Sequence, residues 1–150
     1  MKNKKGFTLI ELLIVMSLIG VLAVIGIQNF RSSQMRARDA VRKSDLRNIQ
    51  TALRLYYNDF GRYPAGTSTM TACGTVAAPA ACPYGAAWTK AGTTYMNILP
   101  DDPQTANNDY VYTYINDDDY TLRACLEMKN DPKGVAFATC NSGYKYEVKP

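Results

Sequence analysis

The chain has 150 residues, which is enough for one domain of ordinary size. It contains no histidine, and this excludes the enzymes and metal sites that depend on an imidazole base or ligand. With 47% hydrophobic and 20% charged residues, the composition also excludes a disordered chain and a polytopic membrane protein. The net charge of +4 is unevenly distributed, since residues 1–6 alone carry three lysines.

The N-terminus combines a lysine-rich leader with a long apolar segment. Lys2, Lys4 and Lys5 precede Gly6, and the 19 residues from 12 to 30 carry no charge. A helix of that length can cross a hydrocarbon layer of about 30 Å. No small-residue cleavage site of the secretory type follows the apolar segment. The pattern therefore predicts a single-pass membrane anchor, with the leader in the cytoplasm and the rest of the chain on the other side.

One carboxylate, Glu11, lies inside this apolar segment. A charge at that depth is costly and usually has a partner; in a simple anchor, the alternative is that it reaches the headgroup layer. The segment KKGFTLIELLIV, residues 4–15, resembles the prepilin leader and helix start of type IV pilins and type II secretion pseudopilins. The resemblance depends on the glycine before Phe7, the glutamate four residues after it, and the long apolar helix that follows.

This resemblance implies a processing and assembly route. A prepilin peptidase would cleave between Gly6 and Phe7, and the new amine of Phe7 would be methylated. Glu11 would then neutralise the Phe7 amine of a neighbouring subunit, because pairing offsets much of the cost of burying each charge. The implied partners are other copies of the chain in a helical homopolymer, the prepilin peptidase, the assembly platform with its ATPase, and the membrane before assembly.

The helix is predicted to continue to residue 60. Apolar residues recur there at spacings of three and four: Leu46, Ile49, Leu53, Tyr56 and Phe60. Such a stripe buries one helical face, and Gly61 followed by Pro64 is a stop signal. A continuous helix over 7–60 would be about 80 Å long. That length suits a subunit whose helices bundle with copies of themselves.

Residues 31–54 carry seven basic against two acidic residues. A nucleic-acid-binding face is one interpretation of this charge, but no aromatic residue is interleaved before Tyr56. We therefore expect these side chains to be solvated just outside the membrane and to contact the acidic heads of neighbouring subunits.

Residues 61–150 are predicted to form a head around an antiparallel sheet. Residues 65–94 are typical of a long surface loop. Alternation from Tyr110 to Ile115 predicts a strand, followed by a turn at 116–119, strands at 120–127 and 135–140, and a last run at 144–148 at the edge of the sheet. One face of this sheet would pack on the helical stripe. The fold class is α+β: a long N-terminal α-helix, membrane-spanning in its first half, packed by its second half on a small antiparallel β-sheet, the pilin fold that the resemblance implies.

The predicted organisation has four parts: a cleaved leader (1–6), a transmembrane and assembly half of the helix (7–30), an amphipathic half (31–60) and a disulfide-bonded head (61–150). Four cysteines without histidine or a C-x-x-C motif favour disulfides over zinc in an exported domain. The preferred connectivity joins Cys73 to Cys82, closing a loop, and Cys125 to Cys140, tying neighbouring strands; free thiols are the alternative. The second pair also resembles the C-terminal disulfide-bounded region of many type IV pilins.

Acidic runs in the head raise the question of a metal. Asp117, Asp118 and Asp119 cap the predicted hairpin, and 101–102 and 107–109 flank its first strand. Such oxygen-rich loops can hold Ca²⁺, and the resemblance to major pseudopilins implies a calcium site in this part of the chain. None of these runs matches an EF-hand, and Asp and Asn are ordinary turn formers. No cofactor is expected, with calcium as the alternative, and neither a catalytic residue nor an enzymatic activity is predicted.

Residues 61–64 and 95–103 resemble the major pseudopilin of type II secretion. The chain lacks the Trp-Gly that usually follows the Asp-Pro of that family, and it adds four cysteines. These differences favour a type IV pilus subunit for adhesion, twitching motility or DNA uptake, anchored in the membrane before assembly and on the cell surface afterwards. Nucleic acid would be a partner only as DNA-uptake cargo. The alternatives are a major pseudopilin, acting as a periplasmic piston for protein export, and a membrane-anchored module that adheres through a tyrosine-rich sheet without polymerising.

Overall fold

The computed structural model describes residues 6–75, 77–104 and 110–150, and its contacts separate a unit up to Met35 from a unit that begins at Arg36. The first element is α1 (Leu9–Phe60), a helix of 52 residues. It ends as predicted: Gly61 has a φ of 66°, and its amide donates to the Tyr57 carbonyl at 2.7 Å. This left-handed cap satisfies a carbonyl that the helix leaves open. The predicted start at Phe7 is two residues too early.

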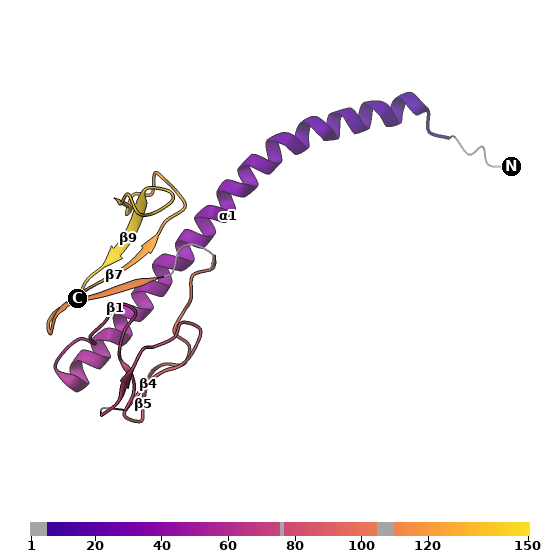
Figure 1. Ribbon diagram of the computed structural model, residues 1–150. Helices are drawn as coiled ribbons and strands as arrows, with labels where there is room; N and C mark the ends of the chain where they lie inside the picture. Colours follow the sequence, from indigo (N-terminus) through magenta and orange to yellow (C-terminus); the bar gives the residue numbers. More distant parts are fainter. Residues whose placement is uncertain (1–5, 76, 105–109) are drawn as a thin grey trace. The chain divides into compact units, whose positions relative to one another are not determined.

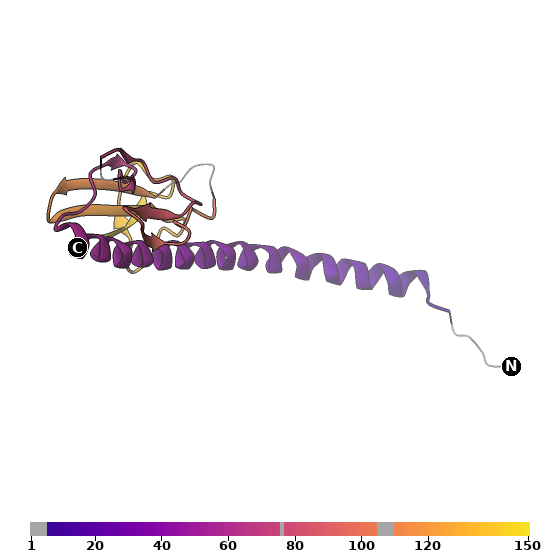
Figure 2. The same cartoon turned by 90° about the horizontal axis from the view of Figure 1, so that it is seen from below.

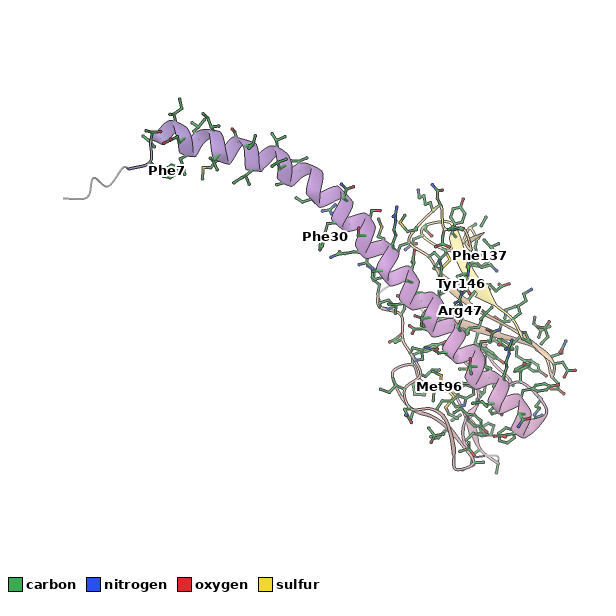
Figure 3. All side chains as sticks on the ribbon, turned by 180° about the vertical axis from the view of Figure 1, so that it is seen from behind. Phe7, Phe30, Arg47, Met96, Phe137 and Tyr146 are labelled. Atoms are coloured by element: carbon green, nitrogen blue, oxygen red, sulfur yellow. A yellow bond between two sulfur atoms is a disulfide. The ribbon has the colours of Figure 1, made fainter. Side chains whose placement is uncertain are left out.

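The first unit consists of the apolar part of α1. Its most apolar 18-residue window has a mean hydropathy of 2.7 and no buried residue. By length and composition, this part of the helix could cross a membrane. Large apolar side chains are exposed along it, from Phe7 at 84% to Phe30 at 63%, and both are labelled in Figure 3.

The second unit contains a five-stranded antiparallel sheet in the order β1-β6-β7-β9-β8. Its strands are β1 (Thr67–Ser68), β6 (Val111–Asn116), β7 (Asp119–Cys125), β9 (Tyr144–Val148) and β8 (Val135–Ala136). Residues 117–118 close the predicted hairpin between β6 and β7. The predicted edge position of 144–148 was wrong. β9 makes four residue pairs with β7, whereas β8 has only two residues and takes the edge.

A second sheet lies in the segment that the sequence predicts as a loop. Its order is β3-β2-β4-β5, with β3 (Pro79–Ala80), β2 (Cys73–Gly74), β4 (Trp88–Lys90) and β5 (Thr93–Met96). The strands have two to four residues each, too short for an alternating pattern to emerge from the sequence.

The core of the second unit forms between the helical stripe and the sheets. Leu46, Ile49 and Leu53 are fully buried, Tyr56 is 6% exposed, and Phe60 packs on the same cluster. Three tyrosines and a leucine complete it: Tyr110, directly before β6, Tyr112 of β6, and Tyr120 and Leu122 of β7. Figures 1 and 2 show β7, β9 and the shorter strands alongside the C-terminal part of α1. The α+β class is thus confirmed, with the predicted stripe as its helical side.

Candidate functional site

The residues assigned to processing precede the helix. Gly6, Phe7 and Thr8 are exposed and not helical. Proteolysis occurs most readily where the backbone is exposed and free of regular structure, and the bond between Gly6 and Phe7 lies in such a segment of the isolated chain. The lysines of the leader lie outside the described residues.

The carboxylate of Glu11 forms a capping box with Thr8. The amide and the hydroxyl of Thr8 donate to Glu11 Oε2 at 2.9 and 2.7 Å, and the Glu11 amide donates to Thr8 Oγ1 at 3.3 Å. These reciprocal bonds satisfy amides that a helix start leaves open. In the isolated chain, therefore, Glu11 has a partner of its own. The T-x-x-E spacing in the sequence is the standard signal for this motif, although only the glutamate was singled out from the sequence.

A buried ionic cluster occupies the second unit; we call it the Arg42 cluster. It consists of two cations and three anions: Arg38, Arg42, Asp39, Asp102 and Glu127. Arg42 is fully buried and binds Asp102 through two hydrogen bonds of 2.7 and 2.8 Å. Its Nη1 also donates to Asp39 at 2.8 Å and to Glu127 at 2.7 Å. One guanidinium thus joins α1 to the segment before β6 and to the segment after β7.

The remaining contacts of the cluster order the backbone around it. Arg38 holds Glu127 with bonds of 2.7 and 2.6 Å, and Asp39 accepts the amides of Glu127 and Met128, each at 2.9 Å. Burial by itself would lower the pKa of Arg42, but the carboxylates outweigh it and raise that pKa. The hydrogen bonds from Arg38 hold the pKa of Glu127 below its ordinary value. The hydrogen bonds and ion pairs of the cluster therefore fix the C-terminal part of α1 to the head.

The basic side chains of residues 31–54 were expected to be solvated and to contact neighbouring subunits. This prediction was wrong for three of them. Arg38, Arg42 and Lys43 bind carboxylates of their own chain, Lys43 pairing with Asp131, rather than being left for neighbouring subunits. The sequence could not reveal these pairs because the partners are 60 to 89 positions away.

Two of the three calcium candidates, Asp117 and Asp118, accept hydrogen bonds from tyrosines in this structure. The Tyr57 hydroxyl donates to Asp118 at 2.5 Å, and that of Tyr114 to Asp117 at 2.7 Å. Across the described residues, no group of three or more Cys, Asp or Glu side chains is arranged to hold a metal. The run 107–109 lies outside the described residues.

The cysteines form two disulfides, Cys73–Cys82 and Cys125–Cys140, the connectivity that the sequence favours. The first joins β2 to a loop after β3. The second joins the end of β7 to a turn after β8 rather than two neighbouring strands, because β8 already ends at Ala136.

Two tyrosines of the predicted tyrosine-rich strand belong to the core. Tyr110 and Tyr112 are 1% and 0% exposed, and their hydroxyls donate to Asp45 and to the Pro64 carbonyl, each at 2.7 Å. These two side chains therefore offer no adhesive surface, whereas Tyr114 of the same strand is half-buried.

Models of two known protein families match this chain, one at its N-terminus and one along most of the remainder. Residues 1–27 match the model of the prokaryotic N-terminal methylation motif, and residues 29–125 match that of type II secretion system (T2SS), protein G. No solved structure matches significantly.

Relatives include both kinds of filament protein. The type II secretion system core protein G of Klebsiella pneumoniae is 34% identical over 103 residues, covering 69% of this chain and 71% of the relative. That of Escherichia coli K12 is 35% identical over 109 residues, covering 73% and 71%. The type IV major pilin protein PilA of Myxococcus xanthus is 42% identical over 61 residues, covering only 41% and 28%.

The methylation motif and the apolar helix indicate membrane anchoring before assembly. Together with the head, which the second family model matches as far as Cys125, they define a structural rather than an enzymatic protein. The chain belongs to the type II secretion system protein G family, within the superfamily of pilins and pseudopilins.

Proposed function

We propose that this chain is the major subunit of a helical filament, polymerised through the helix 7–60. It is made as a membrane-anchored precursor, loses residues 1–6 to a prepilin peptidase, and is methylated on Phe7. The head 61–150 stays on the outer side of the membrane. The partners are its own copies, an assembly platform and an ATPase.

The observation that carries this proposal is the change in side-chain burial along α1. Between Leu9 and Phe30 the large apolar side chains that the structure describes are exposed, whereas from Leu46 to Tyr56 the stripe is buried against the chain's own sheets. The C-terminal part of α1 thus buries its apolar face within one subunit. The N-terminal part needs either a bilayer or other helices, and a polymer supplies the latter.

For the kind of filament, we propose a pseudopilus of the type II secretion class, acting in the export of folded proteins. The similarity to protein G extends through the head to Cys125, and protein G relatives are covered over about 71% of their length. The similarity to PilA covers 28% of that pilin. Extension of the similarity through the head supports the secretion filament.

The second candidate is an extracellular type IV pilus for adhesion, twitching or DNA uptake. Two disulfides clamp the head, and such crosslinks protect a domain that is exposed outside the cell. Electron microscopy of sheared surface material separates the candidates. Long filaments labelled by an antibody to the head support the pilus; their absence, together with export blocked by deletion of the gene, supports the pseudopilus.

The assembly role of Glu11 is tested with three variants in the host. Glu11→Gln removes the charge, Thr8→Ala removes the cap but keeps the carboxylate, and Ser17→Ala is the control, since the Ser17 hydroxyl bonds only the Ile14 carbonyl among the described residues. We expect filaments to be lost in Glu11→Gln and retained in the other two. Normal filaments in Glu11→Gln would refute the pairing, and equal loss in Thr8→Ala would assign the defect to the cap. Mass spectrometry of the N-terminus should find methylated Phe7, and any other start would refute the processing.

A further inference from the structure

The head contains a cavity that the assembly role does not use. It has a volume of about 260 Å³, and we call it the Tyr56 pocket. Aromatic side chains form much of its lining: Tyr56, Phe60, Tyr63 and Tyr114. The volume lies just below the range of about 300 to 1,000 Å³ that is typical of drug-sized ligands. It therefore suits a single small ring rather than an extended molecule.

Two cations line the pocket without an acidic partner. Lys90 is 5% exposed, and its ammonium donates to the carbonyls of Thr75 at 2.9 Å and Cys73 at 3.4 Å. Arg62 lines the same cavity. Within the part of the chain that the structure describes, neither residue has a salt bridge. Neither base is therefore matched by a carboxylate among the described residues, and an anion that enters the pocket would supply the missing partner.

The one carboxylate in the lining does not neutralise these cations. Asp117 accepts the hydroxyl of Tyr114 at 2.7 Å and, among the residues that the structure describes, forms no ion pair with either base. Burial raises the pKa of Tyr56, and the positive charge of Arg62 opposes that rise. The guanidinium is therefore close enough to the aromatic lining to act on it. The pocket as a whole carries one more positive than negative charge.

We propose that the Tyr56 pocket binds an acidic sugar, a hexuronate unit of a polysaccharide. Its carboxylate would be held by Arg62 and Lys90 through charge-assisted hydrogen bonds. Its ring would lie on the apolar faces of Phe60 and Tyr114, with the phenol hydroxyls as partners for its own hydroxyls. This gives the head a ligand role that is independent of filament assembly.

The same geometry argues against a peptide as the occupant. Three strands contribute to the lining, through Pro79 of β3, Lys90 of β4 and Tyr114 of β6. Of these, β3 lies at the edge of the second sheet. Proline has no amide hydrogen to donate to an added strand. A peptide could not extend this sheet by the usual backbone pairing, so a compact ring with a carboxylate fits better.

Binding can be followed on the full mature chain through Trp88, the only tryptophan. Its ring centroid is 5.9 Å from that of Tyr56, so changes in the pocket should alter its fluorescence. The chain should be kept in a polyoxyethylene detergent, because maltosides carry sugars. Glucuronate, galacturonate and mannuronate are titrated as probes, against glucose, acetate and inorganic phosphate, with calorimetry as the second readout.

We expect at least one hexuronate to bind about tenfold or more tightly than glucose, since a charge-assisted bond is worth about one factor of ten or more. It should also bind more tightly than acetate, because acetate lacks the ring that packs on the aromatic lining. Arg62→Gln should weaken that binding about tenfold. Arg123→Gln is the control: Arg123 is a cation on the ring of Phe137, outside the pocket, and the affinity should not change. Lys90→Met should abolish binding, and its circular dichroism shows whether it is folded.

Three results would overturn the proposal. The first is that no hexuronate binds. The second is that acetate or phosphate binds as tightly as the best hexuronate, which would make the pocket a general anion site. The third is that folded Arg62→Gln binds as well as the parent. Because Arg62 is exposed, this variant keeps the test valid even if Lys90→Met fails to fold.

Discussion

Replacement of Arg42 by methionine is the sharpest test of how the helix is attached to the head. Methionine keeps much of the length of the side chain but removes the guanidinium. That group is fully buried and makes four hydrogen bonds to three carboxylates. The substitution would leave Asp39 and Asp102 buried, with Arg38 as the remaining cation of the cluster.

The expected loss is large. Removing one partner of a buried ion pair costs about 3 to 5 kcal/mol, because the other charge stays buried without compensation. Whole domains have unfolding free energies of about 5 to 15 kcal/mol. For a unit of this size, such a loss lowers the melting temperature by roughly 10 to 20 °C.

Near-ultraviolet circular dichroism of the full chain in detergent measures this loss, since the head contains most of the aromatic residues. The control is Arg47→Met. Arg47 is exposed and donates to the Tyr146 hydroxyl at 3.5 Å, an arrangement visible in Figure 3; its loss should cost less than about 0.5 kcal/mol. If Arg42→Met lost less than about 1 kcal/mol, the cluster would not attach the helix in the way that its geometry indicates.

Three further predictions concern the head. Hydrogen bonds from Arg38 lower the pKa of Glu127. Burial raises the pKa of Asp131, but the hydrogen bonds and charges of Lys43 and Lys133 together outweigh it and lower that pKa. Both carboxyls therefore stabilise the folded state fully at pH values above their unfolded-state pKa of about 4 to 4.5. This stability is lost as the pH falls through the lowered folded-state pKa. Urea unfolding midpoints between about pH 3 and 7 measure the loss. Gly61→Ala should cost about 1 kcal/mol in thermal unfolding, since its φ of 66° is strained for alanine although nothing lies within 4 Å of the added carbon. Replacing Cys73 and Cys82 together by serine should cost about 2 to 3 kcal/mol in urea, because the crosslink closes a short loop.

Each of these predictions has its own control. Glu127→Gln should flatten the acid limb of the pH profile; an unchanged slope would contradict the assignment of that limb. Gly61→Asn should lose less than Gly61→Ala, because asparagine tolerates left-handed backbone better. Equal losses would point to a cause other than backbone strain. If the parent protein had the same urea midpoint with and without reductant, the disulfide prediction would fail.

Local patterns gave the helical half of the fold. The recurrence of Leu46, Ile49 and Leu53 identified the buried stripe, and Gly61 identified the end of the helix. Both signals depend on a few neighbouring residues, so they can be read without knowing the tertiary structure. The turn at 116–119 was predictable for the same reason.

The parts of the fold and of the site that could not be predicted depend on contacts between residues that are distant in sequence. Nothing near Arg42 indicates that its partner is Asp102, and a long-range ion pair has no periodic signature. The order of β9 and β8 was wrong in the prediction because chain order suggests neighbours, whereas the number of residue pairs decides which strand is central. The capping partner of Glu11 was local but was overlooked, since the charge was considered only as a group that awaits another subunit.

The capping box at Thr8 changes how the energetics of polymerisation should be considered. Thr8 already gives the carboxylate of Glu11 two hydrogen bonds within its own chain. Both bonds end on Oε2, and a carboxylate has about four acceptor sites, so an amine arriving from another copy can bind without displacing Thr8. The acceptor is already oriented by its own chain, so pairing would cost less side-chain entropy than it would for a freely rotating glutamate. Thr8 thus prepares in the single subunit the geometry that the proposed assembly step uses.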